Sequence, residues 1–130
     1  MRKQLFASLV LAVAVTGSAW AHHNTAGNFD LNQQRFTKTG TLTEIDWRYP
    51  HISLSVDVTS DQGQVETWLF EGWSPSEMLN RGIGKSDCEN SIGKTITVEA
   101  SPARDGSLSG LIGKITLADG KGASLGGTSP

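Results

Sequence analysis

Cysteine is nearly absent from this chain, and Cys88 is the only one among 130 residues. No disulfide can form within the chain, so the fold must rely on a packed core even in an oxidising compartment. The neighbouring acids Asp87 and Glu89 disfavour the thiolate of Cys88, because nearby negative charge raises the pKa of a thiol. We therefore expect Cys88 to be an incidental residue rather than a nucleophile.

Clustered positive charge is missing as well, since 11 Lys and Arg residues are scattered among 13 Asp and Glu residues. Nucleic acid and anionic membranes are poor partners for such a chain, because both attract concentrated basic charge. Beyond the N-terminal 21 residues, no apolar run reaches the length of about 20 residues that crosses a membrane. Catalytic motifs such as a Ser/His/Asp set, a zinc-protease helix or paired carboxylates are not discernible. The sequence predicts a protein that is not an enzyme.

The one long apolar run, residues 5–15, lies behind Arg2 and Lys3 and ahead of Ala19-Trp20-Ala21. This is the pattern of a secretory signal that is cleaved after a small residue. Residues 1–21 therefore predict export to the periplasm and a mature chain that begins at His22, with cleavage after Ala19 as an alternative. Loss of Arg2 and Lys3 leaves 9 basic against 13 acidic residues, a net charge of −4.

Residues 34–121 are predicted to form short strands separated by turns. In residues 51–59, apolar and polar side chains alternate as in a strand with one buried face. One helix interrupts the strands, because Ser74 can cap its first amides, Pro75 suits its first turn and Gly82 can end it. The expected strands are residues 35–49, 51–59, 64–73, 94–101 and 108–117.

The order strand, strand, strand, helix, strand, strand is that of a small five-stranded OB-like barrel, an all-β fold with one short helix. A different five-stranded barrel or a small sandwich is the alternative. We expect residues 22–33 to be an N-terminal arm, residues 34–121 the barrel domain, residues 83–92 a loop, and residues 122–130 a disordered tail.

Two of the three histidines, His22 and His23, open the predicted mature chain, and the third is His51. The amine and imidazole of a terminal His22 can chelate one copper ion, and the imidazole of His23 or His51 can complete a three-nitrogen site. Cleavage after Ala19 instead makes His22 the third residue of the mature chain. A histidine at that position also binds Cu(II), in a square-planar site. The competing interpretation is a loose arm whose histidines take up copper only weakly.

The segment Trp47-Arg48-Tyr49-Pro50-His51 places aromatic and guanidinium groups beside a rigid turn. Such groups commonly form the rim of a ligand site, so Trp47, Arg48 and Tyr49 are candidate ligand-binding residues. For Trp47 the core is the favoured alternative, because a tryptophan buries a large apolar area. Glu71 on the third strand is expected to face His51 or Arg48, either as a structural ion pair or as an acid of the site.

The chain resembles a family of small exported bacterial proteins classed as a domain of unknown function. The resemblance begins with Ala21-His22-His23 and Phe29-Asp30, and its main motif is the segment from Thr39-Gly40 to Trp47-Arg48-Tyr49-Pro50-His51. Tyr49 stands where that family usually has Asn. Further matches are Trp68, Phe70-Glu71-Gly72, Leu79-Asn80-Arg81-Gly82, Gly93 and Ala103-Arg104-Asp105-Gly106. The resemblance implies a fold and an exported location, and it carries no activity.

Three hypotheses follow for a protein that we expect to be monomeric. The first is a non-catalytic binding or accessory protein that holds a small ligand at the Trp47–His51 rim. The second is a copper-binding protein that uses His22 with His23 or His51. The third is a module that binds another envelope protein through a face of the barrel.

Overall fold

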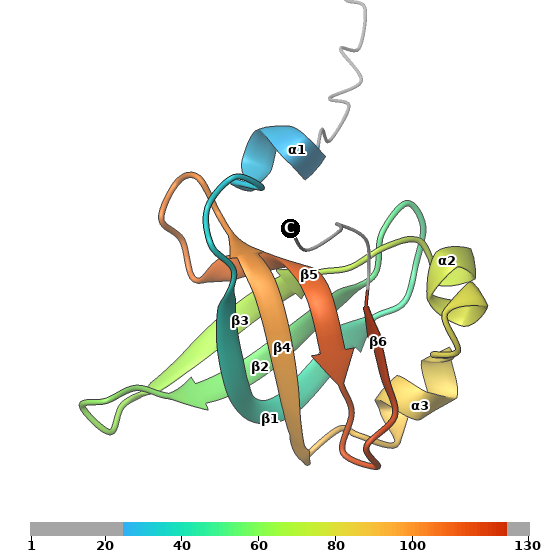
Figure 1. Ribbon diagram of the computed structural model, residues 1–130. Coiled ribbons are helices and arrows are strands. Elements are labelled where there is room, and N and C mark those ends of the chain that lie inside the picture. The colour runs from blue at the N-terminus through green and yellow to red at the C-terminus, as the bar shows by residue number, and fades with distance from the viewer. Residues whose placement is uncertain (1–24, 125–130) are drawn as a thin grey trace, which may run out of the picture.

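The computed structural model describes residues 25–124, which form a β-barrel with three short helices (Figure 1). The strands are β1 (Phe36–Asp46), β2 (Ser53–Thr59), β3 (Val65–Glu71), β4 (Thr95–Pro102), β5 (Ser109–Thr116) and β6 (Gly122–Ser124). The helices are α1 (Thr25–Asn28), α2 (Pro75–Asn80) and α3 (Lys85–Glu89). In this part of the chain, no helix is both long enough and apolar enough to span a membrane.

The strand pairing confirms the predicted OB-like barrel. The strands are ordered β3-β2-β1-β4-β5-β6, and a parallel pairing of β3 with β5 closes the sheet into a barrel of five strands. β1 pairs with β4 from Phe36 to Thr41 and with β2 from Thr41 to Asp46, so one strand serves both sides of the barrel. The long first strand and the helical insertion before β4 are the features that the sequence predicts for this fold.

The core fills the barrel with the alternating apolar side chains that the strand pattern predicts. Leu54, Val56 and Phe70 are fully buried, and Met78 of α2 is buried in the same cluster. Burying a side chain of this size stabilises the fold by about 1.5–3 kcal/mol. α2 begins as predicted, because the Ser74 Oγ accepts the Glu77 N–H at 3.3 Å and Pro75 occupies the first turn.

The predicted loop at residues 83–92 is wrong, because it contains helix α3. The Asp87 carboxylate accepts the Gly84 N–H at 2.8 Å, which caps the start of the helix, and Cys88 is fully buried in the barrel core. The glycines and charges in this segment indicate a loop when they are considered locally. Burial of one helix face against the barrel supplies the stabilisation that overrides this preference.

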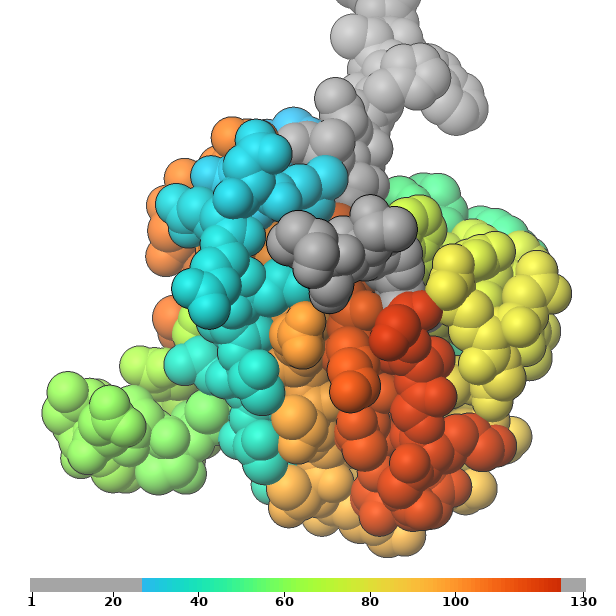
Figure 2. Space-filling view, in the orientation of Figure 1, coloured from blue at the N-terminus to red at the C-terminus, as the bar shows by residue number. Residues whose placement is uncertain are grey.

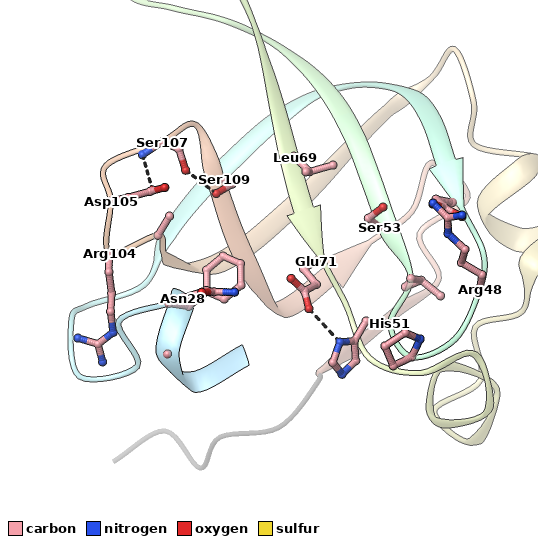
Figure 3. Close-up of a pocket in the computed structure, with 16 residues that line it drawn as sticks. Asn28, Arg48, His51, Ser53, Leu69, Glu71, Arg104, Asp105, Ser107 and Ser109 are labelled. Carbon is pink, nitrogen blue, oxygen red and sulfur yellow. Dashed lines mark hydrogen bonds and ion pairs between the residues drawn. The ribbon is translucent and has the colours of Figure 1, made fainter. Parts of the chain in front are cut away.

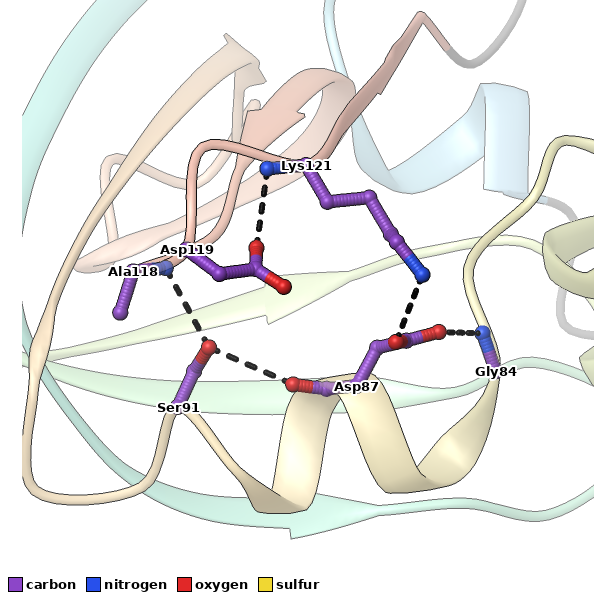
Figure 4. Close-up of polar contacts among 6 residues, drawn as sticks. All are labelled: Gly84, Asp87, Ser91, Ala118, Asp119 and Lys121. Atoms are coloured by element: carbon purple, nitrogen blue, oxygen red, sulfur yellow. Dashed lines mark hydrogen bonds and ion pairs between the residues drawn. The ribbon is translucent and has the colours of Figure 1, made fainter.

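The prediction of a disordered tail at residues 122–130 is wrong for Gly122–Ser124. These residues form strand β6, which pairs with β5. A lysine before this strand reaches α3, where Lys121 Nζ lies 2.8 Å from Asp87 Oδ1 (Figure 4). At the other end of β6, Arg81 donates a hydrogen bond to the Ser124 carbonyl at 2.7 Å. These contacts order a segment whose own composition favours disorder. The rest of the predicted tail lies outside the described residues.

The described part of the predicted N-terminal arm is docked on the barrel rather than loose. Phe29 is 5% exposed and pairs with Ala103 as an isolated β-bridge. The Asp30 N–H donates to the Pro102 carbonyl at 2.8 Å, and the Arg104 N–H donates to the Asn28 carbonyl at 2.9 Å. α1 is thereby held beside the loop between β4 and β5.

The predicted first strand ends too late, and the predicted second strand begins too early. β1 ends at Asp46 and β2 begins at Ser53, so the aromatic segment between them is a loop. The Tyr49–Pro50 peptide bond in this loop is cis. The loop lies at the same end of the barrel as α1 and the β4–β5 loop (Figure 3).

Candidate functional site

A cleft of about 620 Å³ opens where these three segments meet (Figure 3). Asn28 and Phe29 form one wall, and Arg104 of the β4–β5 loop lies beside them. The β1–β2 loop contributes the opposite wall. Apolar and polar groups are mixed in the lining, which is typical of sites for small ligands. The lining residues are Gly27, Asn28, Phe29, Asp46, Arg48, Pro50, His51, Ile52, Ser53, Leu69, Glu71, Ala103, Arg104, Asp105, Ser107 and Ser109.

His51 and Glu71 form a close pair in this cleft. The Nδ1 atom of His51 lies 2.9 Å from Oε1 of Glu71, and the two side chains are 27% and 28% exposed. The pairing of β2 with β3 explains this contact, because Ser53 lies opposite Glu71 and the ladder continues as the Ile52 N–H donates to the Trp73 carbonyl. The strand register therefore places the imidazole beside the carboxylate.

This contact determines how His51 can bind a ligand. A carboxylate can only accept hydrogen bonds, so a hydrogen bond at this contact requires the proton to be on Nδ1 of His51. In the neutral imidazole the lone pair is then on Nε2, the nitrogen that does not contact Glu71. His51 thus offers one electron-pair donor in a fixed ring orientation.

Two other charged groups of the cleft, Arg48 and Asp105, have polar partners within it, and the Asp105 carboxylate stays ionised. Arg48 forms an ion pair with Asp46. Hydrogen bonds from the hydroxyl and the N–H of Ser107 hold the pKa of Asp105 below its ordinary value. Arg104 makes no ion pair with any other described residue. The cleft therefore combines one unpaired guanidinium with the oriented imidazole.

The residues of the predicted rim are in two different environments. Arg48, His51 and Glu71 line the cleft together. Trp47 packs against the core, and Tyr49 is 66% exposed beside the cleft without lining it. His22 and His23 lie outside the described residues. Within residues 25–124, no cluster of three or more His, Cys, Asp or Glu side chains could hold a metal ion.

Sequence reasoning missed the half of the cleft that comes from α1 and the β4–β5 loop. Asn28, Arg104 and Ser107 are polar residues near glycines, so a local pattern indicates only turns. Their position beside His51 depends on the bridge between Phe29 and Ala103 and on the closure of the barrel. The matched segments Phe29-Asp30 and Ala103-Arg104-Asp105-Gly106 were the available signal.

Comparison with known protein families identifies the family of this chain. A family model described as a family of unknown function, DUF6152, matches residues 10–114. The chain belongs to this family. The matched range includes every residue that lines the cleft, so the cleft lies within the family's shared region. No curated protein and no solved structure matches the chain.

Proposed function

We propose that this member of DUF6152 is an exported, non-catalytic binding protein that holds a small ligand in the cleft. The observation that carries the proposal is the oriented His51–Glu71 pair on a partly apolar surface. A volume of about 620 Å³ is within the range of small-molecule sites. By analogy of fold, OB barrels bind ligands on the β2–β3 face between the loops that here carry His51 and Arg104.

The chemistry of the lining narrows the ligand class. The apolar area contributed by Phe29 and Leu69 favours a compact organic body, and the hydroxyls of Ser53 and Ser109 offer hydrogen bonds. Arg104 favours a ligand that carries one acidic group, because its guanidinium has no ionic partner among the described residues. We expect a small polar ligand rather than a polymer with many charges.

A thermal-shift screen of small polar and acidic compounds tests this function in the presence of a metal chelator. A ligand at 100 times its Kd stabilises the folded state by about 2.7 kcal/mol, which raises the Tm measurably. His51→Ala and Arg104→Ala should abolish the shift, whereas Gln64→Ala in the distant β2–β3 turn should retain it. Shifts that survive both cleft variants would remove the cleft as the binding site.

Copper binding is the second candidate, and a specific contact favours it. A metal-bound imidazole typically donates its other N–H to a carboxylate, which fixes the ring and strengthens the ligand. His51 Nδ1 and Glu71 Oε1 lie 2.9 Å apart, which suits this arrangement. His23 precedes Gly27 by four residues, a span of at most about 14 Å, and Gly27 lines the cleft. Only three residues therefore separate His23 in the sequence from a residue that lines the cleft.

Titration with Cu(II), followed by EPR, tests the copper hypothesis. The protein that begins at His22 is compared with one that has a single extra residue before His22, which moves the amine and retains every imidazole. We expect the first protein to bind more tightly, and we expect His51→Ala to remove that advantage. Glu71→Gln should weaken binding by about 10–100-fold, because it alters the orientation of the imidazole. Equal, weak binding by all four proteins would reject the site.

A further inference from the structure

The hairpin formed by β2 and β3 projects from the barrel as a separate lobe (Figure 2). β3 pairs with β2 along its whole length, from Val65 to Glu71. On its other side it pairs with β5 only from Leu69 to Glu71. The first half of β3 is therefore an open strand edge, whereas Leu69 and Glu71 in its second half line the cleft.

The backbone groups at this edge can be identified from the pairing. The Leu69 N–H donates to the Leu108 carbonyl at 3.0 Å, away from β2. Alternate residues of an antiparallel strand direct their N–H and C=O groups to the same side, so those of Val65 and Thr67 also point away from β2. No described strand pairs with them there. Unpaired strand edges of this kind are templates for another strand.

The side chains beside the edge are apolar and accessible. Val65 is 67% exposed and Leu69 is 51% exposed. They alternate with Thr67 on one face of β3, so an added strand would find two apolar contacts on that face. Trp68 on the opposite face is already packed against Phe36, with ring centroids 5.2 Å apart.

The charge of the hairpin determines which strand it suits. Residues 49–80 contain five acidic residues and no Lys or Arg. Three of the acids, Asp57, Asp61 and Glu66, lie on the hairpin, and none of them forms an ion pair with a described residue. Lys38 on β1 is held over the Trp68 ring, 4.7 Å from its centroid. Lys38 is one nearby cation against these three acids, so the hairpin region keeps a net negative charge.

A second copy of this chain is disfavoured at the edge, because it would bring the same acidic hairpin against this one. Antiparallel pairing of two β3 edges, with Val65 opposite Thr67, would place the two Glu66 side chains directly opposite each other. Like charges in that position destabilise a strand pair. The same carboxylate opposite a Lys or Arg side chain would stabilise it.

We propose that the open edge of β3 is a docking site for an extended, basic segment of a protein partner. The segment adds a strand through the backbone groups of Val65 and Thr67, and its basic side chains are attracted by the carboxylates of Glu66 on β3, Asp61 in the turn and Asp57 on the next strand. Backbone pairing supplies affinity in this mode, and the neighbouring side chains supply specificity. This surface shares only Leu69 with the cleft and goes beyond the proposed ligand-binding function.

The test uses the protein without its signal segment and a fluorescent peptide of alternating lysine and valine. We expect saturable binding by anisotropy that weakens with added salt. The same peptide with N-methyl groups on the amides that would face β3 retains its charge and cannot pair, so it should not bind detectably. Equal binding by both peptides would overturn the proposal, because charge alone would then account for it.

Protein variants separate the parts of the proposed surface. Combined Asp57→Asn, Asp61→Asn and Glu66→Gln should weaken peptide binding roughly tenfold, because three exposed negative charges near the edge are removed. The matched control is Asp30→Asn, Glu89→Gln and Asp119→Asn, which removes the same charge elsewhere and should retain affinity. His51→Ala should also retain it, so failure of the cleft hypothesis and failure of this one are distinguishable. Equal losses in the hairpin variant and the control variant would contradict the assigned surface.

Discussion

Gly40 lies where β1 exchanges one partner strand for the other. A Cβ atom at this position would be 2.2 Å from the Asp57 carbonyl oxygen, closer than van der Waals contact allows. β2 approaches β1 this closely because the two sides of the barrel meet at this strand. Glycine is therefore required at position 40 because there is no room for a side chain. Its backbone angle does not require glycine, since its φ is not positive.

We expect Gly40→Ala to destabilise the barrel by about 3 kcal/mol or more, because the backbone of β2 would have to move. Gly63→Ala is the informative comparison, since Gly63 has φ of 79° and open space around it. That change should cost about 1–2 kcal/mol through the left-handed conformation alone. Urea unfolding of both variants measures the two effects. Similar losses would show that the close approach at Gly40 is relieved elsewhere.

Cys88 is a buried structural thiol in this fold. It is fully buried, and burial together with the charges of Asp87 and Glu89 raises the pKa of the thiol to about 11. At about pH 8 only about a thousandth of such a thiol is ionised. We expect no measurable reaction of native Cys88 with a thiol reagent at that pH, and a full equivalent of reaction in denaturant. Rapid labelling of the native protein would contradict the burial.

At the scale of elements, α3 and β6 stabilise each other through a small polar network (Figure 4). Asp87 contacts Gly84 within its own helix and Lys121 before β6. Ser91 donates to the Asp87 carbonyl and accepts the Ala118 N–H, which links the same helix to the end of β5. Neither short element has enough local preference to persist alone, so their contacts must form together.

This network predicts a dependence of stability on acid. The hydrogen bond from Lys121 and then that from the Gly84 N–H hold the pKa of Asp87 below its ordinary value. A carboxylate with a lowered folded pKa contributes stability that is present above its unfolded pKa and is lost as the pH falls through the folded value. The Tm difference between the wild type and Asp87→Asn should be constant from neutral pH to about pH 4 and should shrink below it.

Thermal unfolding across that pH range measures the effect. Asp61→Asn in the exposed β2–β3 turn is the control for the general loss of a carboxylate. A Tm difference for Asp87→Asn that persists undiminished in strong acid would mean that the carboxylate acts through its shape rather than its charge.

At the scale of the whole molecule, barrel closure brings the N-terminal helix, the β1–β2 loop and the β4–β5 loop to one end (Figures 1 and 3). The copper hypothesis depends on processing, because removal of the predicted signal would create the free amine of His22. The tip of the β2–β3 hairpin projects from the barrel (Figure 2). The proposed docking edge and the cleft share only Leu69.

We expect the full chain, expressed with its own N-terminus in bacteria, to be recovered from the periplasmic fraction with residues 1–21 removed. Intact mass spectrometry distinguishes cleavage after Ala21 from cleavage after Ala19, since the two products differ by Trp20 and Ala21. An Ala21→Leu variant should be processed poorly or elsewhere, because signal peptidase requires a small residue there. Recovery of the unprocessed chain from the cytoplasm would contradict both the export and the copper hypotheses.

The amino-acid pattern by itself determined the five main strands, the start of α2 and the barrel class. Alternation in residues 51–59 and the cap at Ser74 are local signals, so they can be recognised without knowing the neighbours. The family relationship, confirmed over residues 10–114, was also accessible from the motif around His51. Export and copper binding remain predictions from the same N-terminal pattern.

Only the tertiary structure decided which residues from distant parts of the sequence lie in contact. The contact of His51 with Glu71 depends on the β2–β3 register, and the approach of Asn28 and Arg104 depends on the Phe29 bridge. α3 and β6 are ordered by contacts with distant segments, which overcome local sequences that favour loops. The physical reason is the same in each case. A strand pattern shows which face is buried, whereas closure of the barrel sets which loops and edges meet or remain open.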